Sequence, residues 1–305
     1  MRARQVIALV VCLASAAVAG CTSDPSDVPA AAPDPSASTQ PTPVQPTYEK
    51  YVALGDSYTA GPFVPTTDVA NGCFRSDGNY PTLVAERIDV AEFVDVSCSG
   101  ASTRDLTKRQ ATVRNASVAP QLDALGEDTD LVTLGIGGND FDLFTTLLQT
   151  CVALRSDDPD GSPCADRLEA RGIDLVAQTR RIGPTVADAV EKVRERAPEA
   201  RVLLVGYPRI SPSSGTCPRL LPFAAGDYQQ GDRVARALND SLRGAARSTG
   251  VEYVDVYAAA EGHDVCADEP WVNGQVTDQT AGLAFHPLPA GMKAVADAVV
   301  EQLDR

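Results

Sequence analysis

The sequence predicts a three-layer α/β/α domain, in which helices cover both faces of a doubly wound parallel sheet of five strands. Three observations predict this class: five short apolar runs, longer segments with helical spacing between them, and an apolar content of 44 %, enough for a sizeable core. Strands that alternate with helices form parallel sheets, because a helical crossover returns the chain to the end of the sheet where the previous strand began.

The five expected strands are short and rich in apolar residues. They span residues 51–54, 93–96, 131–136, 201–205 and 252–256. Three helical patterns lie among the longer segments: residues 166–196, residues 225–247, and the segment after Pro289. We expect a break in the first of them near Gly183-Pro184, because proline lacks the N–H that a helix needs.

Residues 1–20 have the pattern of a bacterial signal peptide. Arg2 and Arg4 precede an uncharged apolar stretch, residues 6–20, which is short for a membrane span. It ends in Val18-Ala19-Gly20-Cys21, which resembles a lipobox. We therefore expect removal of residues 1–20 and lipidation of Cys21. The alternative is a simple secretory signal in which Cys21 has no role.

Residues 21–47 are expected to be the lipidated cysteine followed by a disordered tether. Of the 26 residues 22–47, 7 are Pro and 8 are Ser or Thr, and none is Lys or Arg. Such a segment buries too little apolar surface to offset the entropy lost on ordering. The folded domain is therefore expected to span residues 48–305.

The charge balance excludes one class of partner. The chain has 26 Lys and Arg against 41 Asp and Glu, a formal net charge of −15. Nucleic-acid binding needs clustered basic side chains, so no nucleic-acid partner is expected. With two His residues and no metal-ligand spacing, we expect neither a metal site nor a cofactor.

Six cysteines remain in the expected domain once Cys12 and Cys21 are set aside. They are Cys73, Cys98, Cys151, Cys164, Cys217 and Cys266. Because exported chains meet oxidants, an even number of cysteines favours three disulfides. Six cysteines allow about 15 pairings, and the sequence alone does not choose among them. Cys151 and Cys164 flank a polar loop and are the simplest pair to join.

Candidate chemistry follows the expected strands, at the edge where parallel sheets bind ligands. Gly55-Asp56-Ser57 follows the first strand, and a turn at Gly55 would present Ser57 at this edge. Gly100 follows the second strand and Asn139 the third, while His286 precedes the last helix. The glycine spacing before Asn139 excludes a dinucleotide fingerprint, and no Lys follows to make a phosphate loop. Taken alone, each segment is as typical of a turn or a helix cap.

Together and in this order, the four segments resemble the SGNH (GDSL-type) hydrolase family. Ser57, Gly100, Asn139 and His286 match its four named positions, and the resemblance covers about residues 50–305. It implies a flavodoxin-like sheet and hydrolysis of carboxylic esters. The Gly-Asp-Ser-Tyr segment, the six cysteines and residues 271–274 are similar to the secreted bacterial esterase and lipase branch. That branch implies three disulfides, Cys73–Cys98, Cys151–Cys164 and Cys217–Cys266.

Ser57 and His286 are the expected nucleophile and base. A serine hydroxyl is a poor nucleophile without a positioned base, and the alternative imidazole, His263, is expected on a surface loop. As Ser57 attacks, negative charge develops on the substrate oxygen. The backbone N–H groups of Ser57 and Gly100 and the side-chain amide of Asn139 are expected to form the oxyanion hole that stabilises it.

One position departs from the family. An Asp usually stands three residues before the catalytic histidine, and here that residue is Leu283. The resemblance implies that the backbone carbonyl of Leu283 orients His286, which leaves a Ser–His dyad. Asp278 and Asp264 are the alternatives. A neutral acceptor orients the ring but stabilises the imidazolium less than a carboxylate does.

Three other features have competing interpretations. The apolar run 220–225 lines an acyl groove or packs in the core. Asp140 is expected to stabilise its own turn rather than to form a glycosidase pair with Asp142. Asn115 and Asn239 match the glycosylation pattern, which has no consequence for a bacterial lipoprotein.

The sequence thus predicts a serine esterase or lipase outside the cytoplasm, which hydrolyses carboxylic, fatty-acyl esters through an acyl-Ser57 intermediate. It is expected to be a monomer, held to the outer face of the cell membrane only by its N-terminal lipid, or released. The alternatives are a carbohydrate O-acetylesterase acting on a cell-wall polymer and a non-catalytic binding module of the same fold.

Overall fold

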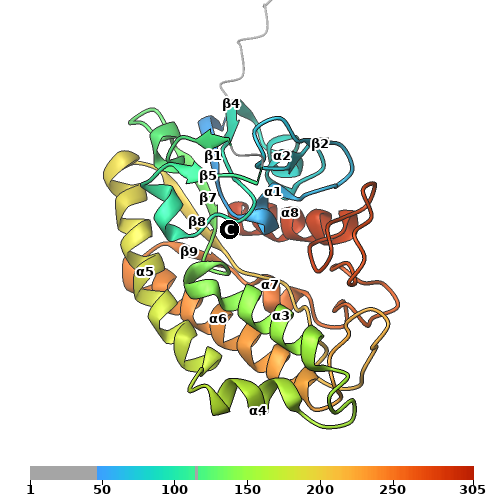
Figure 1. Ribbon diagram of the computed structural model, residues 1–305. Coiled ribbons are helices and arrows are strands. Elements are labelled where there is room, and N and C mark those ends of the chain that lie inside the picture. Colours follow the sequence, from blue (N-terminus) through green and yellow to red (C-terminus); the bar gives the residue numbers. More distant parts are fainter. Residues whose placement is uncertain (1–46, 114–115) are drawn as a thin grey trace, which may run out of the picture. The chain divides into compact units, whose positions relative to one another are not determined.

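A computed structural model describes residues 47–113 and 116–305 (Figure 1). The expected signal peptide, the lipidation site Cys21, nearly all of the expected tether and Asn115 lie outside the described residues. No helix within the described ranges is both long enough and apolar enough to cross a bilayer.

Five parallel strands form the central sheet in the order β4-β1-β7-β8-β9, which confirms the expected fold class. The strands are β1 (Tyr48–Gly55), β4 (Val90–Asp95), β7 (Leu131–Gly135), β8 (Arg201–Val205) and β9 (Glu252–Val254). The chain moves from β1 to β4 on one side and then to β7 on the other. This reversal places a crevice at the carboxyl ends of β1 and β7, where doubly wound sheets bind ligands.

Helices cover both faces of the sheet (Figure 1). The longer helices are α2 (Tyr80–Ala85), α3 (Leu143–Leu154), α4 (Pro163–Ala170), α5 (Leu175–Arg196), α6 (Asp227–Thr249) and α8 (Pro289–Leu303). Successive strand residues point to opposite faces. Val52 and Leu54 of β1 therefore pack with α5 and α6, whereas Tyr51 and Ala53 pack with α2 and α8.

Shorter elements complete the chain. The short helices are α1 (Ser57–Ala60), α7 (Val256–Ala259), η1 (Thr103–Leu106), η2 (Gln121–Ala124) and η3 (Asp140–Asp142). Two small antiparallel ribbons pair β2 (Thr67–Asp68) with β3 (Arg75–Ser76) and β5 (Gln110–Ala111) with β6 (Ser117–Val118). They lie outside the central sheet.

The break expected at Gly183-Pro184 is wrong. The segment contains two helices, and the break comes earlier, where Gly172 adopts a left-handed φ of 68° and Asp174 caps α5 by accepting a hydrogen bond from Ala177. Gly183 and Pro184 lie inside α5. A Cβ at Gly183 would stand 3.2 Å from the Ser241 carbonyl oxygen, so this glycine allows α5 and α6 to pack closely.

Three disulfides lie within the described residues. They join Cys73 to Cys98, Cys151 to Cys164 and Cys217 to Cys266, the pairs implied by the family resemblance. The second joins α3 to α4, and the first fastens the chain just after β4 to the loop before β3. The third joins the loop between β8 and α6 to the loop between α7 and α8.

Candidate active site

Ser57 lies at the first residue of α1, immediately beyond the end of β1. The turn between strand and helix needs Gly55, because a Cβ there would stand 2.6 Å from the Gly135 carbonyl oxygen on the neighbouring strand. The Asp56 carboxylate then caps α1 by accepting a hydrogen bond of 2.8 Å from the Tyr58 N–H. These contacts present Ser57, with 7 % of its surface exposed, at the edge of the sheet.

His286 contacts Ser57 directly, although 229 residues separate them. Its Nε2 is 2.8 Å from the Ser57 Oγ, and its Nδ1 is 2.8 Å from the Ala284 carbonyl oxygen. Burial lowers the pKa of the His286 ring to about 4, an effect that the Ala284 carbonyl partly opposes. The ring is therefore neutral at neutral pH. With Nδ1–H donating to the carbonyl, Nε2 is free to accept the serine proton.

The backbone carbonyl that orients the His286 ring belongs to Ala284. The expectation that the Leu283 carbonyl does so is wrong. The Leu283 carbonyl oxygen instead accepts the His286 backbone N–H at 3.1 Å, which closes a tight turn. Within this turn Phe285 has a positive φ of 61°. The carbonyl oxygen within hydrogen-bond distance of the His286 ring is therefore that of Ala284.

The alternative orienting and basic residues have other partners. The Asp278 carboxylate accepts hydrogen bonds from the N–H and the hydroxyl of Thr280, and the Asp264 carboxylate accepts from the Cys266 N–H. His263 stacks on Trp271, with its Nδ1 at 2.8 Å from a backbone carbonyl oxygen. The described hydrogen bonds of Ser57 and His286 include none of these three alternative residues.

Two side chains hold the loop that carries His286. The Asn273 amide donates to the Gly282 carbonyl oxygen at 2.8 Å, and the Asn273 N–H donates to the His286 carbonyl oxygen at 2.8 Å. The Tyr58 hydroxyl donates to the Phe285 carbonyl oxygen at 2.7 Å. Because Tyr58 follows Ser57, this last bond connects the helix that begins at Ser57 to the loop that carries His286.

Asn139 lines the same pocket as Ser57 and His286, and Gly100 lies in the loop that follows β4. Within the described part of the chain, the N–H groups of Ser57 and Gly100 have no acceptor. The Asn139 Nδ2 donates to the Ala101 carbonyl oxygen at 2.9 Å, which uses one of its two hydrogens. Free N–H groups and a free amide hydrogen can donate to an oxygen atom that carries negative charge, as the donors of an oxyanion hole do.

Further bonds join the strand-end segments to one another. The Cys98 N–H donates to the Gly55 carbonyl oxygen at 3.0 Å. The Asp140 carboxylate accepts hydrogen bonds from the N–H and the hydroxyl of Thr103. The expectation that Asp140 stabilises its own turn is therefore wrong, since its carboxylate connects the third strand-end segment to the second.

A buried chain of hydrogen bonds lies beneath the site. The Tyr207 hydroxyl donates to the Asp56 carboxylate and accepts the Gly138 N–H at 2.8 Å. Burial raises the pKa of the Asp56 carboxyl to about 7. Tyr207 follows β8, so a fourth strand end contributes to the site. Tyr207 was not among the site residues predicted from the sequence, although its position just beyond a buried strand could have indicated it.

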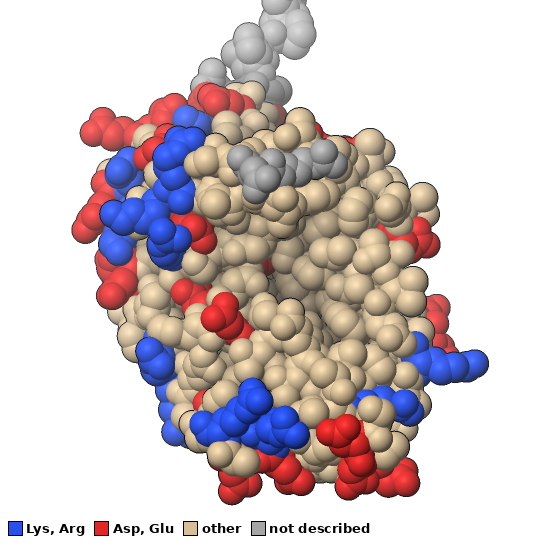
Figure 2. Space-filling model, in the orientation of Figure 1, with Lys and Arg blue, Asp and Glu red and all other residues tan. Residues whose placement is uncertain are grey.

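A pocket of about 320 Å³ opens beside Ser57 and His286. One wall is α3, which contributes Phe144, Thr145, Leu148, Gln149 and Val152. Figure 2 shows a hollow in the region between α1 and α3 that is surrounded mainly by uncharged side chains. The groove considered for residues 220–225 is not this pocket, because none of those residues lines it, and Leu221, Phe223 and Ala224 are buried.

Comparison with known proteins gives consistent matches. A model of the GDSL-like lipase/acylhydrolase family matches residues 53–294. Lipase 2 of Streptomyces coelicolor is 39 % identical over 277 residues, covering 88 % of this chain and 90 % of that protein. Phospholipase A1 from Streptomyces albidoflavus NA297 has a crystal structure with a TM-score of 0.70 and 29 % identity, covering 83 % and 99 % of the two chains. The crystal structure of the extracellular lipase from Streptomyces rimosus matches with a TM-score of 0.65 and 28 % identity, and it too covers 83 % of this chain and 99 % of that chain.

Proposed function

Because the chain belongs to the GDSL-like lipase/acylhydrolase family and is a carboxylic-ester hydrolase, we propose that Ser57 and His286 are its nucleophile and base. The contact that supports this proposal is the 2.8 Å approach of the His286 Nε2 to the Ser57 Oγ, with Nδ1 held by the Ala284 carbonyl. The catalytic unit is then a dyad whose third member is a backbone carbonyl.

The reaction proceeds in two acyl-transfer steps. The Ser57 Oγ attacks the ester carbonyl carbon while His286 Nε2 takes the hydroxyl proton, and the substrate oxygen becomes negatively charged. The N–H groups of Ser57 and Gly100 and the Asn139 amide donate to that oxygen. The C–O bond to the alcohol then breaks, and His286 gives its proton to the leaving alcohol. Water, activated by His286, hydrolyses the acyl-Ser57 ester in the second step.

The proposed substrate is a fatty-acyl ester. The pocket beside Ser57 has the volume of a small-ligand site, and α3 supplies most of its apolar wall. An alkyl chain buried against Phe144, Leu148 and Val152 is stabilised in proportion to the apolar area removed from water. The names of the relatives, lipase and phospholipase A1, are consistent with this class of substrate.

We also propose that the protein is exported and anchored by a lipid on Cys21. The three disulfides are typical of exported proteins, and the related Streptomyces rimosus lipase is extracellular. Growth of the expressing bacterium with an alkyne-labelled fatty acid tests the anchor. Label should enter the wild-type chain and be absent from Cys21→Ser, and an unlabelled wild type would contradict the anchor alone.

Hydrolysis of p-nitrophenyl esters of increasing acyl length tests the enzymatic proposal. We expect hydrolysis of medium and long esters, and a loss of about 10⁴-fold or more in kcat in both Ser57→Ala and His286→Ala. Activity confined to acetyl esters would favour the carbohydrate O-acetylesterase. A folded wild type without activity on any ester would favour the binding module.

A further inference from the structure

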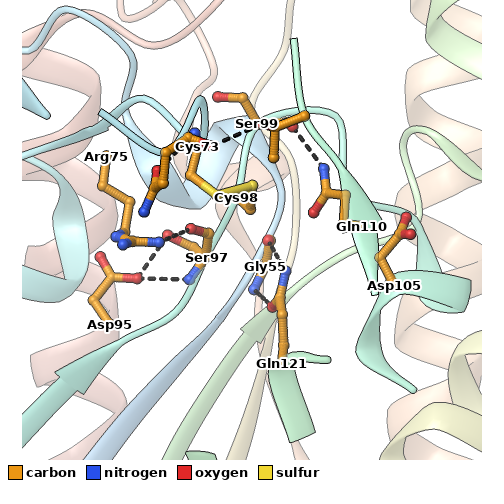
Figure 3. Close-up of a disulfide and its surroundings, with 12 residues drawn as sticks. Gly55, Cys73, Arg75, Asp95, Ser97, Cys98, Ser99, Asp105, Gln110 and Gln121 are labelled. Carbon is orange, nitrogen blue, oxygen red and sulfur yellow. Dashed lines mark hydrogen bonds between the residues drawn. A yellow bond between two sulfur atoms is a disulfide. The ribbon is translucent and has the colours of Figure 1, made fainter. Parts of the chain in front are cut away.

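Gln110 has a contact that the mechanism above does not use. It lies on β5, in the small ribbon β5–β6 outside the central sheet, and only 6 % of its surface is exposed. Its Nε2 donates to the Ser99 carbonyl oxygen at 2.9 Å (Figure 3). Its Oε1 has no hydrogen-bond partner among the described residues.

The Ser99 carbonyl and the Gly100 N–H belong to the same peptide group. A trans peptide is planar, so its C=O and N–H point in opposite directions. A hydrogen bond that fixes the direction of the Ser99 carbonyl therefore also fixes the direction of the Gly100 N–H. The same bond polarises the peptide and makes that N–H a stronger donor.

The two backbone donors of the oxyanion hole are held in different ways. The Ser57 N–H is fixed by α1, because the carbonyl oxygen of Asp56 accepts the N–H groups of Thr59 at 3.1 Å and Ala60 at 2.9 Å. Gly100 lies in a loop and has a left-handed φ of 79°, so no helical hydrogen bond fixes the direction of its N–H. The Gln110 side chain supplies the bond that a helix supplies for Ser57.

We propose that Gln110 is a positioning residue of the oxyanion hole, which holds the Ser99–Gly100 peptide so that the Gly100 N–H faces the developing oxyanion. This role rests on the proposed function of Ser57 and Gly100. The neighbouring contacts anchor the other side of the loop: the Ser99 N–H donates to the Cys73 carbonyl oxygen at 2.9 Å, and Cys73 is bonded to Cys98 (Figure 3).

The unpaired Oε1 supports a functional role for Gln110. Burying an amide oxygen without a partner costs free energy, and an apolar side chain of similar size would avoid that cost. The ribbon is itself attached to the loop that carries Cys73, because the Thr112 hydroxyl donates to the Asn71 carbonyl oxygen at 2.7 Å. The ribbon thus places one buried amide against one peptide of the site.

Steady-state kinetics of Gln110→Met tests the proposal. Methionine keeps the length and volume but donates no hydrogen bond. We expect kcat to fall by about ten- to a hundredfold, less than the loss of a whole oxyanion donor, with KM within about twofold of wild type. The matched control is Gln302→Met, which removes an amide bonded to Glu252 at the opposite edge of the sheet and should leave kcat unchanged.

Gln110→Glu adds a readout that a purely structural role would not change. A carboxylate cannot donate to the Ser99 carbonyl, whereas a protonated carboxyl can. We therefore expect kcat of Gln110→Glu to rise toward the wild-type value as the pH falls from about 8 to about 5, where His286 remains neutral. Gln110→Met should show no such rise, and the Gln110→Glu profile decides the matter if the methionine variant fails to fold.

Several results would overturn this role. The role would be excluded if Gln110→Met had the wild-type kcat, whether or not its KM were raised. It would also be excluded if the pH profile of kcat for Gln110→Glu were identical to that of wild type. Both results would leave the proposed function intact. A wild-type enzyme without esterase activity would instead contradict the proposed function first, and this role with it.

Discussion

Burial sets the protonation state of His286, and in the proposed mechanism this determines the pH dependence of ester hydrolysis. Because the pKa of the ring is lowered to about 4, the neutral form that can accept the Ser57 proton persists well below pH 6.5. We expect kcat/KM to remain level from about pH 8 to about pH 5 and to fall by half near pH 4. Rates with an ester that is stable in acid measure this profile.

A control variant separates burial from other causes. Tyr58 packs against the ring, with 5.1 Å between ring centroids, so Tyr58→Ala should admit water and move the acid limb toward pH 6.5. An acid limb near pH 6.5 in the wild type would contradict the role assigned to burial.

The Tyr207 hydroxyl is expected to contribute strongly to stability. Tyr207→Phe removes a buried hydrogen-bond partner of both the Asp56 carboxylate and the Gly138 N–H. This should lower the free energy of unfolding by about 1–3 kcal/mol. Urea denaturation measures this loss. The control is Tyr80→Phe, since the Tyr80 hydroxyl is buried without a hydrogen-bond partner in the described chain. Equal free energies of unfolding for the two variants would contradict the expected contribution.

Single residues of the site were predictable where a short motif met a strand end. Ser57 and Asn139 follow strands that the apolar pattern located, and His286 precedes a helix that helical spacing located. The Ala284 carbonyl was not predictable, because the choice between neighbouring carbonyls depends on the turn at Phe285. Gln110 was not predictable either, because its contact is made by a ribbon too short to leave a periodic pattern.

At the level of elements, α3 forms the wall that a substrate chain would contact. Val152 lies two turns beyond Phe144, about 12 Å along the helix axis. We expect Val152→Trp to shorten the pocket and to lower kcat/KM for long esters by about ten- to a hundredfold, since overfilling a packed site typically costs about 1–3 kcal/mol. Short esters should be hydrolysed normally.

The neighbouring position provides the matched control for this element. Ala153 is exposed and does not line the pocket, so Ala153→Trp should leave the length profile unchanged. A Val152→Trp enzyme that still prefers long esters would exclude α3 as the acyl wall.

The elements were predicted unevenly for physical reasons. The strands β1, β7 and β8 consist mostly of buried apolar residues, so composition located them, and β4 and β9, which are partly exposed, were located by shorter apolar runs. The helix α3 was missed, although Leu143, Leu147 and Cys151 recur at helical spacing, because it begins directly after a glycine-rich turn in which Phe141 and Asp142 have left-handed φ values. The break between α4 and α5 was misplaced because Pro184 is a strong signal, whereas the actual break depends on a left-handed Gly172.

Across the whole molecule, the three disulfides are expected to carry much of the stability. They close separations of 25, 13 and 49 residues, and each bridge of this kind typically stabilises a protein by about 2–4 kcal/mol. Thermal melting with and without reductant measures the total. We expect a large fall in Tm on reduction, and an unchanged Tm would contradict a structural role for the bridges.

The proposed esterase activity depends on Ser57 as a nucleophile that His286 activates, and covalent labelling tests this most directly. The wild-type protein is treated with a fluorophosphonate, and the modified peptide is identified by mass spectrometry. We expect a single adduct on Ser57, strongly slowed labelling in His286→Ala and none in Ser57→Ala. An adduct on another residue, or labelling of His286→Ala at the wild-type rate, would contradict it.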